Sequence, residues 1–147
     1  EGEVDVSGYL LKNTEKYSIY CTSDQKLINI FSKSLYPDHV IFLGPGIPVF
    51  KSADDANSFN IEMNKKGINL PPFLIIEKYG WFQSNSCIDA ASEMIDCFTE
   101  ILLRLRLDNE IKFFTQDQEN ELLNWDAEIY RQTINWCSLA LTLVHQE

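Results

Sequence analysis

The sequence predicts an α/β domain in which helices cover a β-sheet, and three observations lead to this prediction. Short β-branched or aromatic segments alternate with helical patterns through the first half of the chain. Residues 86–105 then carry one long amphipathic pattern. The length of 147 residues, of which 45% are hydrophobic, fits a single domain over residues 1–147 with a substantial core.

The first predicted elements are a strand and a short helix. Residues 1–16 are polar and carry no regular pattern. The stretch YSIYCTS at 17–23 is short, aromatic and β-branched, which is typical of a strand. A short helix is expected over 24–34, where apolar residues recur and Ser23 can cap the N-terminus.

The stretch SLYPDHVIFLGPG, residues 34–46, is predicted to contain a strand that is buried on both faces. Its run VIFL is continuous and apolar, and a glycine ends it. Pro37 cannot donate a ladder hydrogen bond, so it suits the first residue of such a strand. Asp38 and His39 then form the polar start of the strand, and we expect His39 to make a structural hydrogen bond. Residues 47–50 are expected to extend this strand or to pair with it.

A longer helix and a pair of strands follow. Residues 52–67 are predicted to be a helix that Ser52 caps and a glycine ends, with acidic residues in the first turn and lysines in the last. Residues 73–77 form a predicted strand, and 81–83 form a second extended segment. Because Gly80 makes a turn between them, at least one antiparallel pair is expected.

Long helices are predicted for the last third of the chain. Residues 86–105 begin with a capping-box pattern of Ser86 and Asp89, and Thr115 and Gln118 form a second capping box before one or two more amphipathic helices. The apolar stripe of the first helix is Ile88, Ala91, Ile95, Phe98, Leu102 and Leu105, and that of the later region is Leu122, Trp125, Ile129, Trp136, Leu139 and Leu143.

Composition and charge exclude several classes of function. The net charge is −10 and the basic residues are scattered, so the surface repels nucleic acid and anionic membranes. No apolar run approaches the roughly 20 residues that span a bilayer, and no signal peptide opens the sequence. The wide spacing of the cysteines predicts buried free thiols in a reducing compartment, and hence a cytoplasmic protein; they are Cys21, Cys87, Cys97 and Cys137.

Patterns typical of catalysis are sparse. A catalytic zinc usually needs three protein ligands, and the chain has two histidines, His39 and His145, with no His-x-His pattern. Asp38 and His39 are adjacent, and neighbours on a strand point to opposite faces, which argues against an acid–base pair. Residues 44–46, Gly-Pro-Gly, are too short for a phosphate-binding loop and are explained by turn chemistry.

The segment EKYG, residues 77–80, is the strongest candidate for a binding site. Glu77, Lys78 and Tyr79 close a buried strand just before a glycine turn. Ligands tend to bind at strand ends in α/β sheets, so these side chains are candidates for contact with a ligand. The alternative is a strand end that simply reaches solvent.

Three stretches of the sequence together resemble the C-terminal part of class II aldolase/adducin-like proteins. They are SLYPDHVIFLGPG, PPFLIIEKYGWFQSNSCIDAASEMIDCFTEILLRL and TQDQENELLNWDAEIYRQ. The resemblance covers roughly residues 17–133, and its elements match in order. It implies a three-layer α/β/α fold with a mixed or largely antiparallel central sheet, in a chain that is the C-terminal part of a longer protein.

The resemblance also implies a ligand and a set of binding residues. Enzymes of the family cleave or epimerise sugar phosphates through an enediolate held by zinc, whose ligands are an upstream His-x-His pair and a later His in Asn-His-Gly. The segment Lys78-Tyr79-Gly80 aligns with Asn-His-Gly, and the His-x-His pair is absent from this sequence. We therefore assign no metal ligand and no cofactor to the chain, since zinc would require ligands from another segment. A sugar or sugar phosphate is the implied ligand, with Tyr79, Lys78 and Glu77 as binding residues and His39 at the border of the site.

Three hypotheses of function result. The first is an aldolase-like domain of a carbohydrate-metabolism protein that is not catalytic alone, and stoichiometric zinc in the purified chain would contradict it. The second is an adducin-like module for interaction or oligomerisation, based on Trp125, Tyr130 and Trp136, and a strict monomer in sedimentation would contradict it. The third is a metal-free lyase that uses Tyr79 and Lys78. As partners we expect a second copy of the chain or an upstream aldolase domain.

Overall fold

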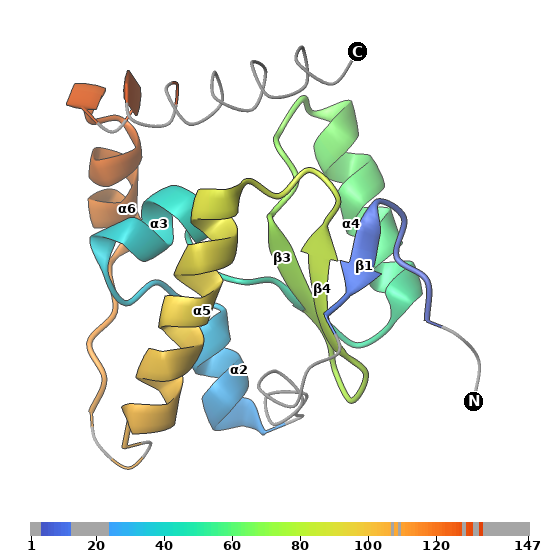
Figure 1. Ribbon diagram of the computed structural model, residues 1–147, viewed down its shortest axis with the longest axis horizontal. Helices are drawn as coiled ribbons and strands as arrows, with labels where there is room; N and C mark the ends of the chain where they lie inside the picture. The colour runs from blue at the N-terminus through green and yellow to red at the C-terminus, as the bar shows by residue number, and fades with distance from the viewer. Residues whose placement is uncertain are drawn as a thin grey trace.

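The computed structural model describes residues 4–12, 24–106, 108, 110–127, 129–130 and 133. Within these residues the chain is an α/β protein with five helices and a four-stranded mixed sheet (Figure 1). The strand predicted at 17–23, with its last residue Ser23, lies outside the described residues. The same is true of Trp136, Leu139 and Leu143.

The sheet has the strand order β1-β4-β3-β2. β3 (Phe73–Ile76) and β4 (Gly80–Ser84) form an antiparallel hairpin, which confirms the two strands and the antiparallel pair that the sequence predicts. β1 (Tyr9–Leu11) lies antiparallel to β4 at one edge of the sheet, and β2 (Val49–Phe50) lies parallel to β3 at the other. The segment 47–50 therefore contains a strand, but the expectation that it extends or pairs with the preceding apolar run is wrong, because it pairs with β3.

β3 is the central strand, and its four side chains are all buried. Phe73 and Ile75 belong to the larger of two apolar clusters, whereas Leu74 and Ile76 belong to the smaller one. Successive residues of a strand point to opposite faces, so a strand that is covered on both faces needs a continuous apolar run. The sequence FLII meets this requirement.

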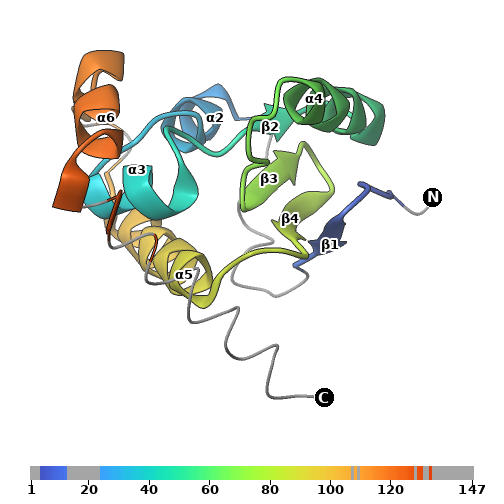
Figure 2. The same cartoon turned by 90° about the horizontal axis from the view of Figure 1, so that it is seen from above.

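Different helices contribute to the two clusters. The larger cluster contains residues of α2 (Gln25–Phe31) and α5 (Asp89–Arg104), and the smaller one contains Ala56 of α4 (Ala53–Lys65). Figure 2 shows α4 and α5 on either side of the strands. The core is therefore built on both sides of the β3–β4 hairpin.

α5 carries the amphipathic stripe that the sequence predicts. Ala91, Ile95, Phe98 and Leu102 are buried, whereas Leu103 on the other side of the helix is 56% exposed. Residues three and four positions apart share one face of a helix, and this face packs into the larger cluster. Burial of apolar surface contributes roughly 25 cal/mol per Å², which makes the α5 contact a major source of stability.

The start of α5 differs from the prediction. The helix begins at Asp89, and its N-cap residue Ile88 makes no side-chain capping bond, so the predicted capping box of Ser86 and Asp89 is wrong. Ser86 instead bonds back to the end of β4: its N–H donates to Ser84 Oγ at 3.2 Å, and the two hydroxyl oxygens lie 2.9 Å apart. Local bonds of this kind from serine compete with helix capping.

The segment predicted as a doubly buried strand, HVIFLG, is a helix instead. α3 (Pro37–Leu43) has Pro37 in its first turn, where the fixed φ suits a helix and the missing N–H has no helical partner to lose. His39, Val40 and Leu43 are buried, a spacing that fits one helix face. A short apolar run does not by itself distinguish a strand from a buried helix. Here the helix places Leu43 in the larger cluster and His39 against Phe98 of α5, so one helix face buries these side chains together.

The other predicted helices in the described residues are confirmed. Asp24 caps α2, Ser52 caps α4, and the capping box of Thr115 and Gln118 opens α6 (Gln116–Leu123). Of the C-terminal helices that were expected, α5 has 16 residues and α6 has 8, and most of the sequence after residue 130 lies outside the described residues. Among the described residues, none of the helices has both the length and the apolar character that a bilayer crossing requires.

Candidate functional site

Three of the four predicted binding residues form the turn between β3 and β4. The Tyr79 N–H donates to the Ile76 carbonyl at 3.1 Å, and Lys78 adopts φ = 68°, in the left-handed region. Glu77 is half-buried, Lys78 is exposed, and the Tyr79 side chain is 56% exposed. These residues line neither the cavity described below nor the groove beside α6. Their role in binding stays a prediction.

His39, the fourth predicted residue, is fully buried between α3 and α5. Its ring makes edge contacts with Tyr36 and Phe98, at centroid distances of 5.5 and 4.7 Å. Within the described residues neither ring nitrogen has a hydrogen-bond partner, so the expected structural hydrogen bond is wrong. Burial lowers the pKa of His39 to about 4, because the imidazolium form would lose its hydration. Figure 1 shows α3 well away from the β3–β4 turn, so the structure does not join His39 to Tyr79.

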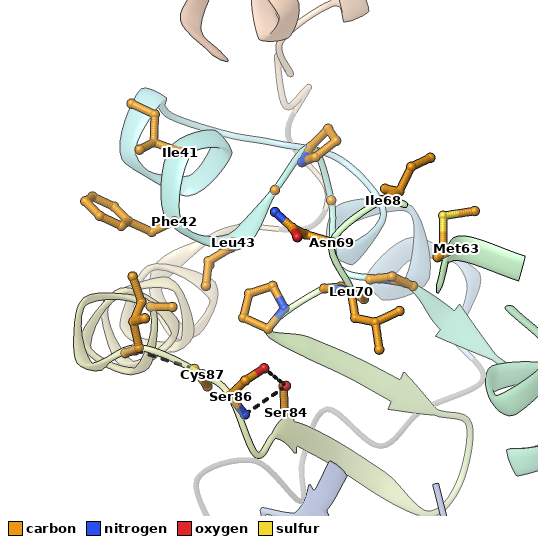
Figure 3. Close-up of a pocket in the computed structure, with 18 of the residues that line it drawn as sticks. Ile41, Phe42, Leu43, Met63, Ile68, Asn69, Leu70, Ser84, Ser86 and Cys87 are labelled. Atoms are coloured by element: carbon orange, nitrogen blue, oxygen red, sulfur yellow. Dashed lines mark hydrogen bonds between the residues drawn. The ribbon is translucent and has the colours of Figure 1, made fainter. Parts of the chain in front are cut away.

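A cavity of about 480 Å³ lies at the other end of the hairpin, where β3 begins and β4 ends. Figure 3 shows that its walls come from the end of α3, from residues 68–72 and from the segment that leads from β4 into α5. The C-terminal half of α4 completes the wall. These segments are far apart in the sequence, and the antiparallel pairing of β3 with β4 brings two of them together at one end of the hairpin.

Neutral polar groups occupy one part of this cavity. Ser84 and Ser86 place their hydrogen-bonded hydroxyl groups there, and the Asn69 amide points into the space from the opposite wall (Figure 3). The Cys87 thiol lies beside them and donates to the Ile88 carbonyl at 3.5 Å. Burial is the main cause that raises the pKa of Cys87 to about 11, so the thiol is protonated at neutral pH and is a weak nucleophile.

The rim of the cavity is conformationally restricted. A Cβ atom at Gly46 would lie 2.5 Å from the Ser32 carbonyl oxygen, so the backbone here packs directly against the segment after α2. Four of the chain's five prolines also line the cavity, and proline fixes φ. Such a rim loses little freedom when a ligand binds. The four residues are Pro45, Pro48, Pro71 and Pro72.

Every described side chain that lines the cavity is apolar or neutral. Zinc is bound by imidazole, thiolate and carboxylate groups, and a set of hydroxyls, an amide and a protonated thiol does not fit it. In the part of the chain that the structure describes, no three or more His, Cys, Asp or Glu side chains are grouped to hold a metal. The cavity is therefore suited to a neutral molecule that combines hydrogen-bonding groups with an apolar surface.

Sequence reasoning missed this cavity. It explained residues 44–46 as a turn and residues 84–87 as the start of a helix. The signal that could have found the cavity is the hairpin itself: an antiparallel turn at 77–79 must bring residues 71–72 beside residues 84–86. The prolines directly before β2 and directly before β3 are a second signal.

No protein family, no curated protein and no solved structure matches the chain. The residues and geometry of the cavity are therefore the basis for assigning a function.

Proposed function

We propose that the chain is a sugar-binding domain of the class II aldolase/adducin-like type that acts in cytoplasmic carbohydrate metabolism as part of a longer protein. We also propose that the helices and the sheet of this domain are arranged as three α/β/α layers. The observation that carries the proposal is the restricted cavity beside Ser84 and Ser86, whose volume of about 480 Å³ falls in the range of small-molecule sites. Two of the stretches that resemble the family, 34–46 and 71–105, also supply much of the lining of this cavity. The proposed sugar site lies at the opposite end of the hairpin from residues 78–80, which the resemblance aligns with the zinc-binding segment of the family.

The lining matches the surface of a neutral sugar. A pyranose ring has apolar C–H faces, which the aromatic side chain of Phe59 can cover, and hydroxyl groups, which Ser86 and Asn69 can bind. A phosphate dianion would lose its hydration without gaining a cation among the lining residues. The charge of Lys12 acts to lower the pKa of the Cys87 thiol, so this lysine is the cation to consider near the cavity. It does not line the cavity, and its ammonium group donates to Gln83 Oε1 at 3.2 Å. We therefore expect the free sugar to bind better than its phosphate ester.

The role assigned to these residues is binding, and no reaction step is assigned to them. The Cys87 thiol is protonated, and the described lining contains no imidazole or carboxylate that could act as a general base. The zinc chemistry of the family would need ligands from another segment or another subunit.

Titration of the purified chain with neutral monosaccharides and with their phosphate esters tests the proposal. We expect a neutral sugar to shift the backbone amide NMR signals of Gly46, Ser84 and Ser86. Each neutral hydrogen bond contributes roughly 0.5–1.5 kcal/mol, so Ser86→Ala and Asn69→Ala should each weaken binding roughly two- to tenfold. Asn85→Ala is the matched control, because Asn85 neighbours the site without lining it.

Two results would contradict the proposal. One is the absence of binding by any sugar of the panel. The other is a preference for phosphate esters with signal shifts confined to residues 77–79, which would place the site at the hairpin turn that the sequence predicts.

A further inference from the structure

A groove beside α6 lies apart from the proposed sugar site and is formed by different residues. α6 and the second residue after its end contribute Gln118, Glu121, Leu122 and Trp125 to this groove. These residues are spaced by three and four positions, so they share one side of the helix. Pro37, at the start of α3, faces them, and the groove encloses about 730 Å³. Figure 1 shows α6 running beside α3.

The floor of the groove is apolar and partly open to solvent. Trp125 is 58% exposed, and Leu122 and Phe114 are half-buried. The chain continues past the groove with two more exposed apolar side chains, Ile129 at 47% and Tyr130 at 68%. Large apolar side chains that are exposed next to one another mark interaction surfaces more often than single ones do.

Contacts on the other side of α6 hold the groove in place. The Ser34 hydroxyl donates to Glu119 Oε1 at 2.5 Å, and the Phe114 N–H donates to the Ser34 carbonyl at 3.1 Å. The capping box at Thr115 fixes the direction in which the helix leaves this anchor. Glu119 is therefore engaged on the inner side of α6, whereas Glu121 lines the groove and is exposed.

The charge around the groove defines its partner. Glu121 is the charged residue in the lining of the groove, and residues 113–130 contain five acidic residues, with Lys112 and Arg131 directly outside this segment. We propose that the groove binds a basic amphipathic helix of a partner protein, which places apolar side chains against Leu122 and Trp125 and lysines or arginines beside Glu121. This is the arrangement by which grooves take amphipathic helices, with anchors at helical spacing and complementary charge around them. A second copy of this chain fits less well, because each copy carries a net charge of −10.

Fluorescence anisotropy with a synthetic probe tests the inference on the full chain. The probe is a labelled Leu/Lys peptide of about four helical turns with its leucines on one face. A peptide of the same composition, scrambled so that no apolar face forms, is the first control. We expect the amphipathic peptide to bind at least about tenfold more tightly than the scrambled one. Trp125→Ala should weaken binding of the amphipathic peptide by at least about tenfold, because truncation of an aromatic anchor has effects of this size.

Two matched variants separate the groove from general attraction to an acidic protein. Glu121→Lys should weaken the amphipathic peptide several-fold more than Glu93→Lys, which makes the same change of charge at an exposed position of α5. Ile61→Ala, at an exposed apolar position of α4, should leave binding unchanged. Equal binding of both peptides, equal effects of the two charge reversals, or no binding at all would overturn the inference.

Discussion

His39 is expected to make the folded protein sensitive to mild acid, and His39→Leu should remove this sensitivity. The imidazole is fully buried against Tyr36 and Phe98, and within the described residues it has no hydrogen-bond partner. Leucine has a similar volume and does not titrate. It also removes two buried polar atoms without partners, so we expect the variant to be at least as stable as the native chain at neutral pH.

The magnitude follows from the two pKa values of the group. In the unfolded chain His39 binds a proton below about pH 6.5, whereas in the folded chain its pKa is about 4. Acid therefore favours the unfolded state between these values, and stability falls as the pH drops from about 6.5 to about 4. One pKa unit corresponds to about 1.4 kcal/mol, so the loss is about 2 kcal/mol at pH 5 and about 3 kcal/mol below pH 4. Above about pH 6.5 the group has no effect.

Urea unfolding at about pH 7.5, 6 and 5 measures this difference. Both chains should carry His145→Gln, which leaves His39 as the only histidine of the reference chain. Carboxylates titrate in the same range, but they cancel in the difference between the two chains. We expect the stability advantage of His39→Leu to grow by about 2 kcal/mol from pH 7.5 to pH 5. An advantage that does not change with pH would refute the burial of a neutral imidazole.

Three further predictions concern the core and two backbone positions. Ile95→Ala should lower the free energy of unfolding by about 2–5 kcal/mol, whereas Leu103→Ala on the exposed side of α5 should lower it by less than about 1 kcal/mol. Denaturant titrations measure both losses, and losses of similar size would contradict the orientation of the helix. Gly46→Ala should lower the free energy of unfolding by about 1–3 kcal/mol, because the alanine Cβ would lie 2.5 Å from the Ser32 carbonyl oxygen. An unchanged thermal midpoint would show that the backbone at Gly46 does not contact Ser32. Lys78→Gly should stabilise the fold by up to about 1 kcal/mol, because glycine relieves the left-handed φ of 68°, and a loss of stability in urea titrations would contradict the turn conformation.

The elements that the sequence predicts well are those whose signals are local. Ser52 caps α4, and Thr115 with Gln118 caps α6, through bonds to residues one turn away. The stripe of α5 repeats over several turns, so its period is unambiguous. The signal for the β3–β4 hairpin is also local, because a short turn joins two apolar strands that are close in the sequence.

The features that the sequence does not predict depend on contacts between distant segments. The run of residues 40–43 is compatible with either a strand or a helix, and the helix that forms packs against α5, which lies about 50 residues further along the chain. Ser86 could cap a helix, but the end of β4 offers it Ser84 first. The cavity exists only after α3, α4 and the two ends of the hairpin have been brought together, so no single stretch of sequence contains it.

The order of the strands also has a consequence for folding and for aggregation. The hairpin closes over a few residues, whereas β1 pairs Tyr9 with Ser84 and must cross most of the domain to do so. Loop-closure entropy then favours early formation of the hairpin and late addition of β1. In the native state β1 is a three-residue edge strand with Leu10 68% exposed, and a short, exposed edge strand can open locally. When it opens, the backbone of β4 becomes a free edge that another chain can pair with. The hydrogen bond of 2.6 Å from the Tyr9 hydroxyl to the Pro71 carbonyl ties β1 to the segment before β3, and each contact of this kind favours the state in which the edge of β4 is covered.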